Sequence, residues 1–312
     1  MRIAIIGVGA MGSVYAGLMA DAGLDVWAVD VWREHVDAIR AHGLRVSGAS
    51  GERVARLQAT TDPRAAGPAD LVIIATKADG VETAARSARG ILAEDGVVLT
   101  IQNGLGSADR VAGIVGPEAL LVGVVGGFGA SIRAPGHVHH NGWEFVRLGE
   151  HAGGITPRLE RVGEVWEQAG FKVLLFPDIH RMVWEKFICN VAYSGPCTLT
   201  GMTVGEVMAD PDASEVSATC AREAFAVARA KGIAVEIEDP VAYVRAFGDR
   251  IPGARPSMLL DHMAKRRSEI DIINGAVPRV AAEVGLAAPV NATVAALVRA
   301  RERTFGGPAN GA

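Results

Sequence analysis

The feature that most constrains the fold of this chain is a glycine-rich turn close to its start. Residues 3–6 form an apolar run suited to a buried strand, and good helix formers follow from position 11. A strand, a turn with glycines at its first, third and sixth positions, and a helix together begin a parallel α/β sheet. The turn reads Gly7-Val8-Gly9-Ala10-Met11-Gly12.

Each glycine of this turn has its own physical role. Gly7 permits a tight turn, Gly9 lets the backbone approach a pyrophosphate, and Gly12 allows the helix to pack closely. The start of the helix adds unpaired N–H groups and the positive end of its dipole. We therefore expect the six residues of the turn to bind a dinucleotide. A glycine-rich turn without a ligand is the alternative.

An acidic residue ends the next predicted strand. Asp30 is placed to accept hydrogen bonds from the adenosine ribose hydroxyls and to repel a 2′-phosphate, which favours NAD over NADP. Arg33 points the other way, because an arginine just past this strand can hold the 2′-phosphate of NADP. Alternatively, Arg33 is a solvated charge at the start of a helix. The sequence therefore predicts an NAD(P)H site, with NAD favoured.

The rest of the first half alternates short β-branched runs with helical stretches, which is typical of a parallel sheet covered by crossover helices. Added antiparallel strands are expected within residues 136–148, where apolar residues alternate with turn residues. Strands are predicted at residues 3–6, 26–29, 71–75, 97–101 and 120–125, and helices at residues 11–21, 32–41 and 81–92.

The second half of the chain differs from the first in its predicted secondary structure. From residue 177 the strand signals fade and alanine-rich helical segments replace them, including residues 213–232 and 276–301. We therefore predict a Rossmann-type, doubly wound α/β domain over residues 1–176. An all-helical domain is predicted over residues 177–312.

Composition excludes several classes of function. The formal net charge of −4 comes from 35 acidic and 31 basic residues without a basic block, so nucleic acid is not an expected partner. No apolar span approaches the roughly 20 residues of a membrane helix. Cys189, Cys197 and Cys220 lack the paired spacing of a metal site, which indicates free thiols in the cytoplasm. His139 and His140 would point to opposite faces of a strand, so no metal is predicted.

Three polar residues in the second half share one helix face. Lys186, Asn190 and Ser194 are spaced four residues apart among mostly apolar neighbours. An unpaired buried lysine is costly, so this stripe either meets partners inside the protein or lines a cavity. In the first interpretation Lys186 is a structural residue whose charge is paired inside the protein. In the second, the three residues form the wall of an active site.

Other polar residues are candidates for the same site. Ser257 and Glu269 follow in the second half, and Glu269 is a possible partner for Lys186. In the first half, Thr76-Lys77 and Gln102-Asn103-Gly104 come just after predicted strands. Ligands bind at this carboxyl edge in open parallel sheets, so we expect cofactor and substrate contacts there.

Together these motifs resemble the ketopantoate reductases, and the resemblance runs in order along nearly the whole chain. It rests on Gly7-x-Gly9-Ala10-x-Gly12, Thr76-Lys77, Gln102-Asn103-Gly104, Trp184-x-Lys186-x-x-x-Asn190, Ser257-Met258 and Glu269-Ile270-Asp271-x-x-Asn274-Gly275. The resemblance implies a 2-oxo acid bound in the cleft between a Rossmann domain and a helical domain, and a helical domain that often supplies a dimer surface.

The resemblance also implies roles for individual residues. Lys186 is then the general acid that protonates the developing alkoxide, and Glu269 steadies the lysine or the nicotinamide end of the cofactor. The substrate oxygens fall to Asn103 and Asn190, and its carboxylate to Ser257. Carbonyl reduction builds negative charge on oxygen, and an ammonium both stabilises that charge and supplies a proton.

Two positions depart from the family pattern. Where ketopantoate reductases often carry asparagines that receive the hydroxyl end of the substrate, this chain has Ser194 and Ala254. We therefore carry three hypotheses. The first is reduction of ketopantoate to pantoate for pantothenate synthesis, and the second is an NAD-dependent 2-hydroxy acid dehydrogenase with another substrate. A dinucleotide sensor without catalysis is the third.

Overall fold

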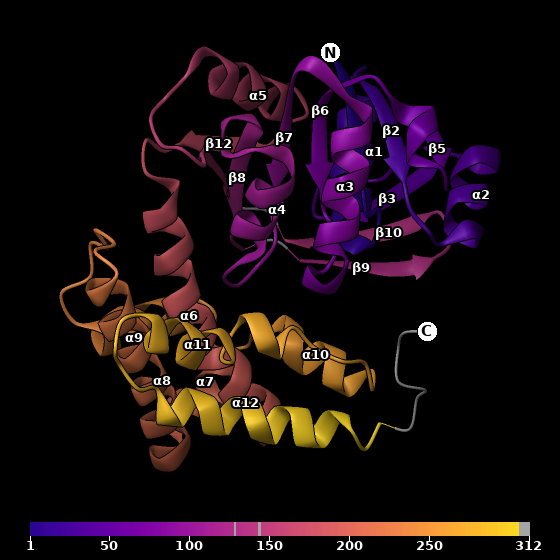
Figure 1. Cartoon of the computed structure of the whole chain (residues 1–312). Coiled ribbons are helices and arrows are strands. Elements are labelled where there is room, and N and C mark those ends of the chain that lie inside the picture. The colour runs from indigo at the N-terminus through magenta and orange to yellow at the C-terminus, as the bar shows by residue number, and fades with distance from the viewer. Residues whose placement is uncertain (128, 143–144, 306–312) are drawn as a thin grey trace. The chain divides into compact units, whose positions relative to one another are not determined.

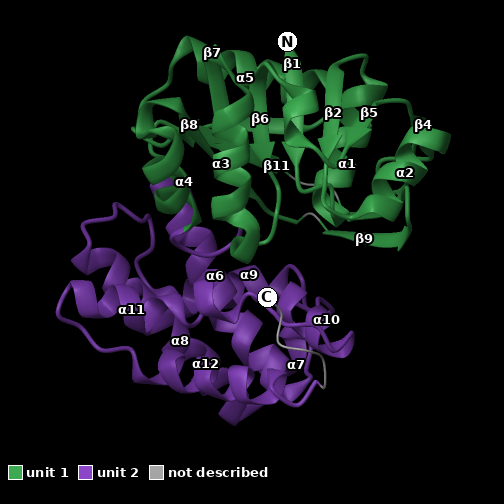
Figure 2. Ribbon diagram, turned by 45° about the vertical axis from the view of Figure 1, so that its right-hand side comes forward, with its two compact units in different colours: residues 1–102, 107–179 green, residues 103–106, 180–312 purple. Residues whose placement is uncertain are grey.

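The structure is a computed structural model that describes residues 1–127, 129–142 and 145–305. Its contacts divide the chain into two compact units, coloured separately in Figure 2. Unit 1 comprises Met1–Gln102 and Ser107–Ile179, and unit 2 comprises Asn103–Gly106 and His180–Ala312. A turn of four residues inside the first half thus belongs to the helical unit.

Unit 1 is built on a sheet of eight strands in the order β12-β11-β8-β7-β6-β1-β2-β5 (Figure 1). Strands β3, β4, β9 and β10 form a separate sheet in the same unit. The strands are β1 (Arg2–Ile6), β2 (Asp25–Val29), β3 (Leu44–Gly48), β4 (Arg53–Ala55), β5 (Gln58–Thr60), β6 (Ala69–Ile74), β7 (Leu92–Thr100), β8 (Leu120–Val125), β9 (Gly129–Ala134), β10 (His137–Gly142), β11 (Phe145–Glu150) and β12 (Lys172–Leu175). The helices are α1 (Ala10–Asp21), α2 (Arg33–His42), α3 (Val81–Ile91), α4 (Ser107–Val115) and α5 (Pro157–Gln168), with short 3-10 turns η1 (Pro63–Ala66), η2 (Ala78–Gly80) and η3 (Pro117–Ala119).

Strand β1 lies at the point where the strand order reverses. It pairs in parallel with β2 on one side and with β6 on the other. The chain then extends the sheet through β5 on the β2 side and through β7 and β8 on the β6 side. Open parallel sheets bind their ligands beyond the carboxyl end of the strands at such a reversal. The glycine-rich turn follows β1 directly.

The core explains why β1 is apolar at every position after Arg2. Successive side chains of a strand point to opposite faces. Ile3 and Ile5 pack with residues of α1 and α5, including Tyr15 and Trp166. Ala4 and Ile6 pack on the other face with residues of α3 and α4. Burial on both faces confirms the predicted parallel α/β architecture.

The added strands partly match the expectation for residues 136–148. Antiparallel pairs form between β9 and β10 and between β8 and β11, as predicted. However, β10 also pairs in parallel with β3 in a separate sheet of order β4-β3-β10-β9, and β11 pairs in parallel with β12. The sequence pattern did not predict β3, β4, β5, β9 or β12, most of which are only three to five residues long.

Unit 2 is all-helical over its described residues, which confirms the predicted fold class. Its elements are α6 (Ile179–Thr200), α7 (Val204–Ala209), α8 (Pro211–Ala230), α9 (Pro240–Asp249), α10 (Ser257–Met263), η4 (Ile270–Ile272), α11 (Ala276–Glu283) and α12 (Pro289–Glu302). The single helix expected at 276–301 is wrong. Gly285 has a φ of +72°, which ends α11, and Pro289 begins α12 at a position where its missing N–H is not needed.

Candidate active site

The glycine-rich turn of unit 1 shows why each glycine is required. A Cβ atom on Gly7, whose φ is +94°, would lie 2.6 Å from the backbone nitrogen of Thr76. On Gly12 it would lie 2.1 Å from the carbonyl oxygen of Gly7. On Gly9, by contrast, it would meet no atom of the described chain within 4 Å. Contacts within the protein therefore require glycine at positions 7 and 12. No such contact requires glycine at position 9, where a missing side chain suits the close approach of a ligand.

The start of α1 supplies the donors that such a ligand needs. Gly9 is the N-cap residue and makes no side-chain capping hydrogen bond to the first N–H groups of the helix, those of Ala10, Met11 and Gly12. These groups and the helix dipole favour a phosphate. Val8 itself is fully buried in the core. These residues fit the pyrophosphate of a dinucleotide.

Asp30 stands directly after β2. Its Oδ1 accepts a hydrogen bond of 2.9 Å from the backbone N–H of Trp32, and its own N–H donates to the carbonyl oxygen of Thr60. The carboxylate is thereby fixed at the carboxyl edge of the sheet and half-buried. Arg33, the competing signal, is exposed at the first position of α2.

The residues after β6 and β7 form one connected edge. Gln102 Nε2 donates to the carbonyl oxygens of Ile74 and Thr76, at 2.7 and 3.2 Å. The methyl group of Thr76 backs the glycine turn, and its Oγ1 is buried without a hydrogen-bond partner in the described chain. Lys77 is exposed just before η2. Gln102 therefore joins the ends of two strands, a role that sequence spacing did not predict.

The lysine of unit 2 has a defined partner. Lys186 Nζ on α6 donates to Asn103 Oδ1 at 2.7 Å, and both residues are half-buried. Asn103 lies in the turn 103–106, which packs on η4 of the same unit. The N–H of Leu105 donates to the carbonyl oxygen of Ile272 at 2.9 Å, and a Cβ on Gly104 would lie 2.3 Å from that oxygen. Only glycine fits this contact, so the turn is held against η4.

Glu269 immediately precedes η4. Its carbonyl oxygen accepts hydrogen bonds from the N–H groups of Ile272 and Ile273, and the residue is half-buried. It thus begins the segment on which the turn with Asn103 packs. That Glu269 steadies Lys186 stays a prediction.

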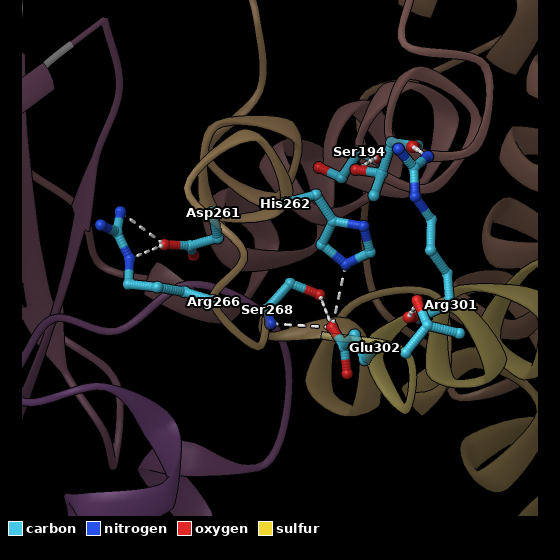
Figure 3. A network of polar contacts seen from close by, with 9 residues as sticks. Ser194, Asp261, His262, Arg266, Ser268, Arg301 and Glu302 are labelled. Atoms are coloured by element: carbon cyan, nitrogen blue, oxygen red, sulfur yellow. Dashed lines mark hydrogen bonds and ion pairs between the residues drawn. The ribbon is translucent and has the colours of Figure 1, made fainter. Parts of the chain in front are cut away.

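The connection that leads to Glu269 is held by a buried carboxylate, shown in Figure 3. Glu302 Oε1 on α12 accepts hydrogen bonds from the N–H and Oγ of Ser268, at 2.8 and 2.6 Å. His262 Nε2 on α10 lies 3.1 Å from the same oxygen. Asp261 Oδ1 accepts from Arg266 Nε at 3.1 Å, which closes the loop. Sequence reasoning missed the role of Glu302, because its partners Ser268 and His262 lie 34 and 40 residues away in the chain.

The remaining predicted residues differ in exposure. Asn190 is half-buried one turn after Lys186, and Ser194 is buried one turn further along α6. Ser257 is exposed as the first residue of α10. Asn274, quoted above only as part of a motif, is fully buried, and its Nδ2 donates to the carbonyl oxygen of Val191 in α6 at 2.8 Å. Asn274 therefore holds the helix that carries the lysine.

Comparison with known proteins decides the family. Two family models match, "Ketopantoate reductase PanE/ApbA" over residues 3–153 and its C-terminal counterpart over residues 178–302. The chain belongs to the ketopantoate reductase family. It is accordingly an NAD(P)-dependent oxidoreductase that reduces 2-oxo acids, and the resemblance seen in its motifs is confirmed.

Several members of this family are similar along their full length. A 2-dehydropantoate 2-reductase of Halobacterium salinarum is 32% identical over 304 residues, which cover 97% of this chain and 99% of that protein. The ketopantoate reductase structure from Ralstonia eutropha JMP134 has a TM-score of 0.90 at 30% identity and covers 98% of this chain and 100% of its own. A D-mandelate dehydrogenase solved with NADH and anilino(oxo)acetate has the same TM-score at 28% identity, with 98% and 99% coverage.

In this family member the cysteines lie away from any reactive environment. Cys189, Cys197 and Cys220 are all buried and free, and burial raises the pKa of each thiol to about 12. Such thiols are poor nucleophiles. Within the described part of the chain, no helix is long and apolar enough to cross a membrane, and no cluster of three or more potential metal ligands occurs.

Proposed function

We propose that this chain reduces ketopantoate to pantoate with NADH as the preferred cofactor, and that Lys186 is the general acid. The observation that carries this proposal is the 2.7 Å hydrogen bond from Lys186 Nζ to Asn103 Oδ1. It joins a half-buried ammonium to a second polar group on a turn that is itself held by backbone contacts. The names of the curated relatives support ketopantoate as the substrate.

The geometry suits the protonation step. The reduced nicotinamide supplies a hydride to the carbonyl carbon when it is bound. Negative charge then develops on the carbonyl oxygen, and the ammonium of Lys186 stabilises that charge and donates a proton, so that a 2-hydroxy acid results. Asn103 accepts from the ammonium, which fixes the direction of Nζ. In this proposal Asn103 and Asn190 also contact the substrate oxygens, Ser257 its carboxylate, and Ser194 the side pocket.

Asp30 carries the proposed preference for NADH. Its carboxylate is fixed by the N–H of Trp32, and a fixed negative charge repels a 2′-phosphate. A relative at 28% identity was solved with NADH. The exposed side chain of Arg33 at the start of α2 is the feature that favours NADPH instead.

A second candidate function is the NAD-dependent oxidation or reduction of a different 2-hydroxy or 2-oxo acid. Ser194 and Ala254 replace asparagines that the family often uses for the hydroxyl end of ketopantoate, and a serine and an alanine offer fewer hydrogen bonds there. The D-mandelate dehydrogenase match gives this candidate specific support, because that protein has an aromatic substrate and shares the fold along its whole length.

One set of assays tests both candidates. Purified protein is mixed with NADH or NADPH and with ketopantoate, benzoylformate or other 2-oxo acids, and the absorbance of the reduced cofactor is followed. A higher kcat/KM for ketopantoate supports the first candidate, and a higher value for another acid supports the second. Absence of turnover with every acid would leave the sensor hypothesis.

The role of Lys186 is tested on the best substrate. Lys186→Ala is expected to lower kcat by about 100-fold or more, the usual effect of losing a general acid, with NADH binding nearly intact. Lys231→Ala is a matched control in unit 2, because Lys231 forms an ion pair with Glu283 at the surface. Near wild-type turnover in Lys186→Ala would reject the assignment.

A further inference from the structure

A buried histidine lies behind the glycine-rich turn of unit 1. His35, in the first turn of α2, is fully buried, and both of its ring nitrogens have partners. Nδ1 lies 3.0 Å from the backbone nitrogen of Gly136, and Nε2 lies 3.1 Å from Ser13 Oγ. A buried polar ring with both nitrogens engaged is costly to displace.

The backbone determines where the protons in this network lie. The N–H of Gly136 can only donate, so His35 Nδ1 accepts and carries no proton. Nε2 therefore carries the proton and donates to Ser13 Oγ. The hydroxyl of Ser13 is then left to donate to the carbonyl oxygen of Val8, at 2.7 Å. Burial lowers the pKa of His35, with Asp30 opposing, which is consistent with a neutral ring.

This chain of hydrogen bonds ends in the middle of the cofactor-binding turn. The carbonyl of Val8 and the N–H of Gly9 belong to one planar trans peptide, so they point in opposite directions. Because the carbonyl is held by Ser13, the Gly9 N–H points away from Ser13. Gly9 is also a position where an added Cβ would meet no atom of the described residues within 4 Å. The network therefore orients the peptide that approaches a pyrophosphate.

The same imidazole supports the ribose end of the site. Its ring stacks on the indole of Trp32, with centroids 4.8 Å apart and an interplanar angle of 12°. The N–H of Trp32 holds Asp30 Oδ1 at 2.9 Å. One buried side chain is thus connected to the phosphate turn through Ser13 and to the ribose carboxylate through Trp32.

We propose that His35 is a positioning residue for the dinucleotide, which orients the Val8-Gly9 peptide through Ser13 and fixes the Asp30 segment through Trp32. The inference rests on the proposed use of NADH. It assigns His35 an effect on cofactor affinity and none on the protonation step at Lys186.

The test measures NADH binding by fluorescence titration and steady-state kinetics in His35→Gln, His35→Asn and Ser13→Ala. The amide of Gln reaches the position of Nε2 and retains the bond to Ser13, whereas Asn reaches only the position of Nδ1. We expect His35→Asn and Ser13→Ala each to raise the Kd for NADH about tenfold, as for one lost buried hydrogen bond. His35→Gln should raise it by less than about threefold. At saturating NADH, kcat is expected to stay within about twofold of wild type in all three.

His42→Gln is the matched control, because His42 is an exposed histidine at the end of the same helix. Thermal unfolding identifies any variant that fails to fold, and Ser13→Ala is the least disruptive of them. An unchanged Kd in both Ser13→Ala and His35→Asn overturns the proposal, and so does a fall in kcat without a change in Kd. Wild-type binding of NADH without turnover of any oxo acid would instead contradict the proposed function alone.

Discussion

The two units hold their functional groups by different means. In unit 1 the candidate pyrophosphate-binding turn after β1 is a backbone segment, fixed by closely fitted glycines, main-chain hydrogen bonds and the hydroxyl of Ser13. In unit 2 the candidate catalytic groups are side chains on α6, on the turn 103–106 and on the segment before η4, and other side chains fix these segments, as Glu302 fixes Ser268 beside Glu269. An atom added at Gly7 or Gly12 would clash with the backbone, whereas a side-chain site depends on its supporting hydrogen bonds. Substitutions in the two units should therefore fail in different ways.

The largest effect is expected from Gly9→Asp in unit 1. An aspartate is a good N-cap and interacts favourably with the helix dipole, so the thermal stability of the protein should be unchanged or raised. The same charge repels a pyrophosphate, and NADH affinity should fall by about 100-fold or more. Isothermal titration calorimetry measures the affinity, and calorimetric unfolding measures the stability.

Gly113→Asp provides the matched control, since Gly113 lies in α4 and its added Cβ also meets no atom within 4 Å. Wild-type NADH affinity in Gly9→Asp would show that the turn does not bind the cofactor.

The next effect concerns the choice of cofactor. Asp30→Asn keeps an oxygen that accepts from the N–H of Trp32 but removes the charge. The ratio of kcat/KM for NADH to that for NADPH should then fall by roughly 30-fold, because the repulsion of the 2′-phosphate is lost. Asp25→Asn, at the opposite end of β2, should leave the ratio unchanged. A constant ratio in both variants would mean that Asp30 does not select the cofactor.

A smaller effect is expected in unit 2 from Glu302→Ala. The half-buried donors of Ser268 lose their acceptor, and the segment that carries Glu269 loosens. We expect kcat/KM for the oxo acid to fall by about tenfold while the Kd for NADH stays constant, on the scale of hydrogen bonds to a charged group. Glu302→Gln, which keeps an acceptor oxygen, should retain most activity.

Glu283→Ala serves as the control for Glu302, because Glu283 is a partly exposed glutamate at the end of α11 in the same unit. Equal activity in Glu302→Ala and Glu283→Ala would remove the buried carboxylate from any role in the site.

The smallest effect is a dependence of stability on pH. Burial lowers the pKa of His35 below its ordinary value of 6.5, so the folded state binds fewer protons than the unfolded state in mild acid. The contribution of His35 is therefore fully present above pH 6.5 and is lost as the pH falls through the lowered pKa. When the pH falls from 7.5 to 5.5, the free energy of unfolding should decrease more in wild type than in His35→Gln, by at most about 1.4 kcal/mol. Urea titrations at both pH values measure it, and equal losses would argue against a neutral buried His35.

The difference between the units also explains what the sequence could predict. The glycine spacing and apolar strands of unit 1 are local patterns, and they predicted the turn, the central strands and the position of Asp30. The helical pattern of unit 2 was also visible, apart from the break between α11 and α12. What escaped prediction are contacts between distant residues. Lys186 meets Asn103 across 83 residues of chain, and the Ser13–His35–Gly136 network joins three separate elements. Periodicity carries no information about such partners.

The four-residue turn 103–106 has a consequence for how the molecule can be divided. Gln102 is bonded to strand ends of unit 1, and the next residue, Asn103, is bonded to Lys186 of unit 2. The polypeptide therefore passes between the units at positions 102, 106 and 179. Cutting the chain once near residue 179 would leave this turn on the fragment that lacks its lysine. A recombinant swap of the helical half into a related reductase must consequently carry a matching turn, or Lys186 loses its hydrogen-bond partner.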